Sequence, residues 1–267
     1  MTLRICVAGA TGWVGRVLVP AIVEADDLTL SGAVARKDAG RDLGAALGRE
    51  DLGLVIAPSV ADALAAPADV LIDYTAPASV KEHVLEAIER GVGVVVGTSG
   101  LTAADYDEID ALARERGVGV VGSGNFTLTA ALMQHFAAIA AAHVPQWEVL
   151  DYARAEKPDV PSGTARELAE RLGSVRKPRS GVALDALRGP TETRGAEIAG
   201  VRVHSMRLPG YVLAVEAIFG LTGERLTLRH DGGESAEPYV AGTLLAARKA
   251  PRLKGVVRGL DRLLFDA

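Results

Sequence analysis

Short apolar runs of strand length alternate with amphipathic stretches along the first half of the chain. The runs are rich in Val, Ile and Ala, and the stretches that follow repeat their apolar positions at helical spacing. The predicted strands cover residues 3–9, 28–34, 68–74, 92–96 and 118–121, and the predicted helices cover 13–24, 79–90 and 103–116. Strands that alternate with helices predict a parallel sheet of the α/β class with right-handed crossovers.

The pattern changes in the second half of the chain. Residues 174–200 are polar, with several Pro and Gly, and are typical of a long loop. Helices are expected at 126–143 and 162–172, strands at 148–152, 201–206, 211–219 and 225–229 (the last three antiparallel), and helices again at 235–248 and 256–264. We expect two domains: a dinucleotide-binding domain of residues 1–124, with 232–267 packing back on it, and a C-terminal mixed-sheet α+β domain of residues 125–231. The second would bind the substrate and support oligomerisation.

Composition excludes several classes of function. The chain has 267 residues and a net charge of −5, without a block of Lys or Arg, so nothing favours nucleic-acid binding. We expect neither a membrane span nor a signal peptide, and therefore a cytoplasmic enzyme acting on a small molecule. Cys6 is the single cysteine and is expected to be a buried thiol, which leaves no Cys-based zinc site and no predicted metal.

A glycine pattern follows the first predicted strand. Gly9, Gly12 and Gly15 lie in the spacing Gly-x-x-Gly-x-x-Gly, directly before a helix. That context predicts a Rossmann-type turn, in which glycines permit the tight turn, the approach of a pyrophosphate and close helix packing. The residues Thr11, Trp13 and Val14 within the turn are expected to contact the cofactor as well. The alternative is a strand-to-helix turn without a ligand.

The second strand suggests which nucleotide binds. NAD-specific sites usually place an acidic residue at the end of this strand, whereas this chain has Ala35-Arg36-Lys37. A cation suits the 2′-phosphate, so NADPH is favoured over NADH and Arg36 is the candidate ligand. An ordinary solvated charge at Arg36 is the alternative. The strand ends 74–77, 97–100 and 122–126 are rich in small or hydroxyl residues, which suits a flat cofactor.

The run from Val149 to Ala165 carries the candidate substrate site. Ser162 in Pro-Ser-Gly-Thr can cap the following helix, and a helix start attracts carboxylates and phosphates. Lys157 lies just upstream, where it could donate a proton, bind a carboxylate or form a surface ion pair with Glu156 or Asp159. We expect the nicotinamide on the first sheet to face an anion held by this helix start.

These motifs together resemble the bacterial 4-hydroxy-tetrahydrodipicolinate reductase (dihydrodipicolinate reductase) family of lysine biosynthesis. The similarity covers nearly the whole chain and is most specific in Lys157-Pro-Asp-Val-Pro-Ser-Gly-Thr-Ala165. It implies a homotetramer that transfers hydride from NAD(P)H to a cyclic, dicarboxylated C=N substrate. The cofactor would be lined by Gly9, Gly12, Arg36, Thr75, Gly97, Thr98, Asn125 and Phe126, and the substrate by Lys157, Ser162, Gly163 and Thr164.

The chain departs from this family at two places. Ala153-Arg154 stands where the family usually has two histidines, and Ala214-Val215 stands where it usually has Glu-His. Arg154 could clamp a carboxylate or be a strand-surface charge. The alternatives are therefore a paralogue that reduces another imine or a ketone, and a nucleotide-binding relative without catalysis. His204 and His230 are expected to be structural.

A short-chain dehydrogenase, which also begins with spaced glycines, is rejected. That class needs Tyr-x-x-x-Lys, and no tyrosine of this chain has Lys four residues later.

Overall fold

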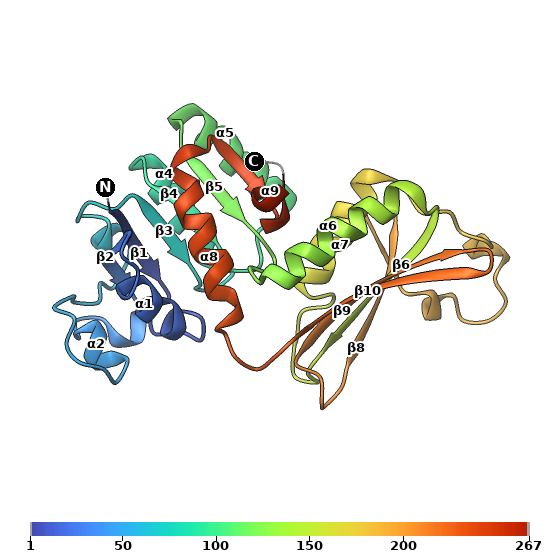
Figure 1. Cartoon of the computed structure of the whole chain (residues 1–267), viewed down its shortest axis with the longest axis horizontal. Coiled ribbons are helices and arrows are strands. Elements are labelled where there is room, and N and C mark those ends of the chain that lie inside the picture. The colour runs from blue at the N-terminus through green and yellow to red at the C-terminus, as the bar shows by residue number, and fades with distance from the viewer. Residues whose placement is uncertain (1, 266–267) are drawn as a thin grey trace. The chain divides into compact units, whose positions relative to one another are not determined.

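The computed structural model describes residues 2–265, which form two compact units (Figure 1). The first unit comprises Met1–Leu128 and Ser235–Ala267, and the second comprises Thr129–Glu234. The second unit is therefore inserted in sequence between two segments of the first.

The first unit is built on a six-stranded parallel sheet with the strand order β11-β5-β4-β3-β1-β2. Its strands are β1 (Leu3–Ala8), β2 (Leu28–Val34), β3 (Val70–Asp73), β4 (Gly93–Val96), β5 (Gly119–Gly122) and β11 (Gly255–Arg258). The α/β prediction is confirmed, and the five strands predicted in the first half all form. Three of them, β3, β4 and β5, are buried at every position, which explains their continuous apolar runs.

The helix predicted over residues 256–264 is wrong in its first part. Gly255–Arg258 forms β11, which pairs in parallel with β5, and only Leu260–Phe265 is helical, as α9. A run as short as Gly-Val-Val-Arg carries no usable periodicity. Its extended conformation is fixed by pairing with a strand far away in sequence.

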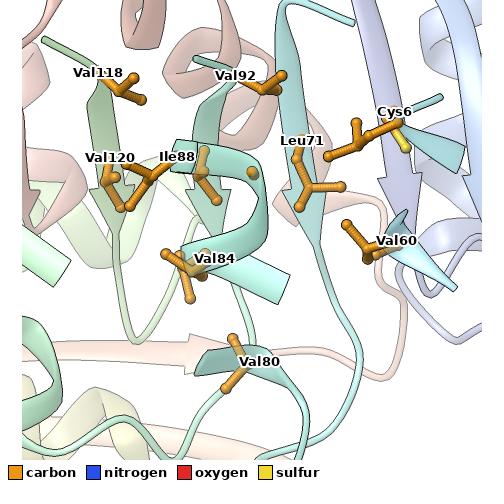
Figure 2. Close-up of a cluster of buried hydrophobic side chains, with 14 of the residues drawn as sticks. Cys6, Val60, Leu71, Val80, Val84, Ile88, Val92, Val118 and Val120 are labelled. Atoms are coloured by element: carbon orange, nitrogen blue, oxygen red, sulfur yellow. The ribbon is translucent and has the colours of Figure 1, made fainter. Parts of the chain in front are cut away.

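Helices cover both faces of this sheet (Figure 1). On one face, Val84 and Ile88 of α4 pack with Leu71, Val120 and other strand residues (Figure 2). On the other face, α1 and α8 contact each other, and α8 contacts β3 and β4. The helices of this unit are α1 (Gly15–Val23), α2 (Leu43–Ala46), α3 (Val60–Ala63), α4 (Val80–Glu89), α5 (Ala103–Arg116), α8 (Pro238–Lys249) and α9, with short 3-10 turns at Arg36–Asp38 and Ala250–Arg252.

The second unit contains a five-stranded mixed sheet with the order β10-β9-β6-β8-β7. Its strands are β6 (Gln146–Ala153), β7 (Ala196–Ile198), β8 (Val201–Arg207), β9 (Leu213–Leu221) and β10 (Glu224–Gly232). The β9–β10 hairpin is antiparallel, as expected, but β8 pairs in parallel with β6 rather than with β9. The loop predicted for 174–200 contains β7, which pairs with β8, and two 3-10 turns, at Leu184–Ala186 and Thr191–Arg194.

Two helices, α6 (Leu128–His143) and α7 (Gly163–Val175), pack on one face of this sheet. Their buried residues join Trp147, Val149 and Phe219 of the strands in one core. The start of α7 lies where β6 and β8 end, because Ser162 is bonded to Asp151 of β6. The sheet thus positions the helix start at which the sequence predicts an anion site.

Candidate functional site

The glycine turn after β1 has the geometry that a dinucleotide needs. Gly9 has a φ of +84°, and a Cβ there would lie 2.1 Å from the carbonyl oxygen of Tyr74. A Cβ at Gly15 would lie 2.2 Å from the carbonyl oxygen of Gly9, so helix α1 can approach β1 only with glycine at this position. Gly12 is exposed, which leaves uncovered backbone where a pyrophosphate would lie. These residues fit a nicotinamide dinucleotide.

The other residues of the turn differ in what they can contribute. The Trp13 ring is 54% exposed and packs edge-on against Tyr239, with 5.6 Å between ring centroids. Val14 is buried, so its side chain belongs to the core. The Thr11 hydroxyl is bonded to Asp38, which lowers the pKa of that carboxyl below its usual value.

The end of β2 is followed by a cation, Arg36, and an anion, Asp38. Arg36 is exposed at the start of the 3-10 turn Arg36–Asp38, as a ligand for a 2′-phosphate would need to be. Asp38, which sequence reasoning did not single out, lies two residues later and pairs with Arg41 at 2.9 Å. Its carboxylate is therefore held by Arg41 and Thr11.

Thr75 and Thr98 lie together at the carboxyl edge of the sheet. The Thr75 N–H donates to the Thr98 hydroxyl at 2.7 Å, and both hydroxyls donate to Asp73 at the end of β3. The Asp73 carboxylate is fully buried and also accepts a hydrogen bond from Nδ1 of His83, at 2.7 Å. Sequence analysis missed the role of Asp73, although its position at a strand end was a usable signal.

Three further predicted cofactor residues make packing contacts or hydrogen bonds within this unit. A Cβ at Gly97 would lie 2.1 Å from the Tyr74 ring, so the glycine leaves room for that ring. Phe126 is buried and packs edge-on against the same ring, with 6.2 Å between centroids. Asn125 is buried, and its side-chain oxygen accepts from the N–H of Thr127 at 2.8 Å.

The start of α7 is organised by Ser162 and Asp151. The Ser162 hydroxyl caps the helix by accepting from the N–H of Ala165 at 3.3 Å, as the sequence predicts. It donates at the same time to Asp151 Oδ1 at 2.6 Å, and the Ser162 N–H donates to Oδ2 at 3.0 Å. Gly163 is half-buried and Thr164 buried. The helix dipole points its positive end at this corner.

Asp151 is the second residue that sequence analysis missed. It is fully buried, accepts from the Ser205 hydroxyl at 2.9 Å, and forms an ion pair with Arg207 at 2.8 Å. Arg207 also donates to the carbonyl oxygen of Asp159, at 2.7 Å. The α7 end of the segment between β6 and α7, which contains Lys157, is thereby tied to the sheet through Asp159 and Ser162.

Lys157 and Arg154 lie on this segment. Lys157 pairs with Asp159 at 2.9 Å, and the two side chains are 30% and 42% exposed. This is the surface ion pair that the sequence left open, and solvent weakens such a pair. Arg154 is exposed beyond the end of β6, where a carboxylate could reach it.

Of the positions at which the chain was expected to depart from the family, Ala153, Ala214 and Val215 are buried, whereas Arg154 is exposed. Ala153 and Val215 are fully buried, and Val215 lies in register between Asp151 of β6 and His230 of β10. His230 is buried and shares a hydrogen bond between its Nδ1 and Thr129 at 3.1 Å, whereas its Nε2 has no partner among the described residues. Burial lowers the pKa of His230.

His204 lies elsewhere in this sheet and bonds through Nε2 to Glu148 at 2.7 Å. Within residues 2–265, no cluster of His, Cys, Asp and Glu could hold a metal ion, and no helix is long and apolar enough to span a membrane. Cys6 is buried, which raises the pKa of its thiol to about 12.

Comparison with known proteins identifies the family. Residues 3–126 match the family model for the N-terminus of dihydrodipicolinate reductase, and residues 128–264 match the model for its C-terminus. The chain belongs to the dihydrodipicolinate reductase family. The family resemblance is thereby confirmed, and with it the prediction of an NAD(P)H-dependent oxidoreductase.

Individual relatives agree with this result. The 4-hydroxy-tetrahydrodipicolinate reductase of Moorella thermoacetica is 40% identical over 98% of both chains, and that of Thermosynechococcus vestitus is 38% identical over 98% of this chain and 97% of the other. The solved dihydrodipicolinate reductase from Paenisporosarcina sp. TG-14, bound to dipicolinate, is 28% identical and has a TM-score of 0.78. The match covers 98% of this chain and 99% of that structure. An amine dehydrogenase from Mycobacterium smegmatis shares the fold, with a TM-score of 0.70 and 16% identity over 98% of this chain and 96% of that structure.

Proposed function

We propose that this chain reduces a cyclic, carboxylated C=N substrate, namely the imine intermediate of lysine biosynthesis, with NADPH as the preferred cofactor. The observation that carries the proposal is the α7 corner, where Ser162 caps the helix start and is bonded to the buried Asp151. Membership of the dihydrodipicolinate reductase family supports it. The substituted histidine positions make a paralogue that reduces another imine or a ketone the second candidate.

The residues of the second unit would bind and orient the substrate. One carboxylate would lie at the start of α7, against Gly163 and Thr164, where the helix dipole stabilises negative charge. Lys157 would exchange Asp159 for the substrate and bind a carboxylate or hold a proton near the reduced nitrogen. Arg154 is the candidate for a second carboxylate, because a guanidinium binds carboxylates in a bidentate manner.

A bound NAD(P)H supplies the hydride, and the first unit would hold it. The backbone of the turn Gly9–Gly15, with Thr11 and Trp13, would contact the pyrophosphate region, and Arg36 the 2′-phosphate. Addition to an iminium carbon needs little acid assistance, because the nitrogen already carries positive charge. A ketone would need a proton donor, which contributes ~10²–10⁴-fold, and Lys157 is the nearest candidate at the corner.

Oxidation of NADPH with the lysine-pathway imine tests the proposal, followed by a panel of cyclic imines and ketones with and without ammonia. Turnover of the first substrate supports the principal function, turnover of the panel alone supports the paralogue, and cofactor binding without any turnover refutes both. Lys157→Ala should lose most activity and keep its affinity for NADPH. Unchanged activity would remove Lys157 from the mechanism.

The cofactor preference has its own test. Arg36→Ala should weaken NADPH binding by about tenfold, the worth of one charge-assisted hydrogen bond, and leave NADH binding unchanged. Lys37→Ala, the neighbouring exposed cation, is the matched control. Equal losses for both nucleotides would show that Arg36 does not read the 2′-phosphate.

We also propose a homotetramer assembled through the second unit. Helices cover one face of its sheet, and the other face carries apolar side chains, including the partly buried Leu150 and Ile218 and the exposed Met206. A partner sheet would bury them. Light scattering at low concentration tests this assembly, and Ile218→Glu should dissociate it.

A further inference from the structure

The Asp73 carboxylate, at the carboxyl edge of the first sheet, receives four hydrogen bonds. Its Oδ1 accepts from the hydroxyl of Thr98 at 2.5 Å, from the hydroxyl of Thr75 at 2.8 Å and from the N–H of Thr75 at 3.2 Å. Its Oδ2 accepts from Nδ1 of His83 at 2.7 Å. The side chain is completely buried, so these donors take the place of water.

The direction of these bonds determines what the two threonines can offer a ligand. An ionised carboxylate only accepts hydrogen bonds, and a hydroxyl has a single proton to donate. The hydroxyls of Thr75 and Thr98 therefore both donate their single hydrogen bond to Asp73. Thr98 Oγ1 also accepts from the N–H of Thr75 at 2.7 Å, which leaves one lone pair on that oxygen. Thr75 Oγ1 also lies 3.4 Å from the Ser79 hydroxyl, which leaves at least one lone pair on this oxygen as well. Toward a ligand, both oxygens can therefore only accept hydrogen bonds.

His83 keeps this arrangement fixed. Its ring lies on α4, is 18% exposed, and holds Oδ2 of Asp73 away from the threonines, so that Oδ1 alone serves both hydroxyls. Gly97 and Thr98 are anchored as well, because the Gly97 N–H donates to the carbonyl oxygen of Asp73 at 2.9 Å. The two loops that follow β3 and β4 are thus held together by one carboxylate.

We infer that Asp73 makes Thr75 and Thr98 obligate hydrogen-bond acceptors, and that these oxygens bind the carboxamide NH₂ of the nicotinamide. A phosphate offers acceptor oxygens and a negative charge, and would meet lone pairs and a buried carboxylate here. The carboxamide NH₂ offers two donors to two acceptors. Phosphates belong instead at the turn Gly9–Gly15, where the uncovered backbone and the helix start favour them.

Asp73 is a positioning residue in this inference, since it acts through the threonines. The inference rests on the proposed function only in requiring that the chain bind a nicotinamide nucleotide. Two ligands distinguish binding of the nucleotide in general from recognition of the carboxamide. The nucleotide 2′,5′-ADP reports the phosphate and adenosine half alone, and the 3-acetylpyridine analogue of NADPH replaces the carboxamide NH₂ with a methyl group.

The experiment compares binding of NADPH, the acetylpyridine analogue and 2′,5′-ADP to the full-length chain by calorimetry. The wild-type chain should bind NADPH about tenfold more tightly than the analogue, the value of one good hydrogen bond. Asp73→Ala, which removes the acceptor of both threonine hydroxyls, should bring this ratio close to one, and Thr98→Val, which leaves Thr75 in place, should lower it, with the affinity for 2′,5′-ADP unchanged in both variants. Thr29→Val, an exposed threonine on β2, is the matched control and should keep the wild-type ratio.

Each outcome decides one point. A wild-type ratio near one, or a tenfold ratio that persists in Thr98→Val, would overturn the inference. Unchanged 2′,5′-ADP affinity in Asp73→Ala shows that the variant is folded, and Thr98→Val decides the matter alone if Asp73→Ala is not. Failure of the wild-type chain to bind 2′,5′-ADP would overturn NADPH binding itself, and with it the proposed function.

Discussion

Replacement of Asp151 by Asn should destabilise the second unit strongly. The carboxylate is fully buried and pairs at 2.8 Å with Arg207, whose side chain is 14% exposed. Removing one charge of a buried pair leaves the other uncompensated, at a cost of ~3–5 kcal/mol. Asn keeps an acceptor oxygen for one serine hydroxyl, so we expect the lower end of this range. At ~2–4 °C per kcal/mol for a chain of this size, the melting midpoint should fall by roughly 6–12 °C.

Thermal unfolding followed by circular dichroism measures this shift. The matched control is Asp27→Asn, which breaks an exposed ion pair with Arg248 and should leave the midpoint almost unchanged, because solvent screens that pair. A double variant, Asp151→Asn with Arg207→Met, should be more stable than the sum of the single losses, since it removes the stranded charge. Strictly additive losses, or a midpoint like that of the control, would refute the explanation.

Two further predictions concern one residue in each unit. Gly9→Ala should weaken 2′,5′-ADP binding by about 5–150-fold, which corresponds to ~1–3 kcal/mol of strain, because the methyl group would meet the Tyr74 carbonyl. Gly40→Ala has a similar φ of +85° but open space around it, and should leave binding unchanged; equal losses would contradict the steric explanation. His230 has a lowered pKa, so the unfolded chain takes up a proton first as pH falls below about 6.5, and stability should decrease on acidification. His230→Gln should reduce that slope in urea unfolding measured at several pH values, and an identical slope would assign it to other groups.

The sequence predicted the elements with long, regular patterns and missed those that depend on distant partners. Helix α5 is found at its predicted bounds because its cap and its apolar positions are local. Strand β11 was missed, since four residues form a strand only through pairing with β5. The parallel pairing of β8 with β6 was missed for the same reason, as register is a property of the sheet rather than of either strand.

In the candidate sites, too, residues with a local signal were identified and residues with distant partners were missed. Ser162 was identified because a helix cap leaves a local signature in the sequence. Asp151 was not identified, because its partners Ser205 and Arg207 lie more than fifty residues away along the chain. Asp73 was passed over although it lies at the end of a predicted strand, because its partners Thr98 and His83 come from other elements of the fold.

The position of β11 has a consequence for how the molecule is made. The last strand of the nucleotide-binding sheet is translated after the whole inserted unit, and until then β5 has an unpaired edge of apolar backbone. A fragment that stops before Ser235 would carry that edge permanently and would be prone to aggregate through it. The sheet can therefore be completed only after residues up to Arg258 have left the ribosome, so that its folding depends on a segment made after the second unit.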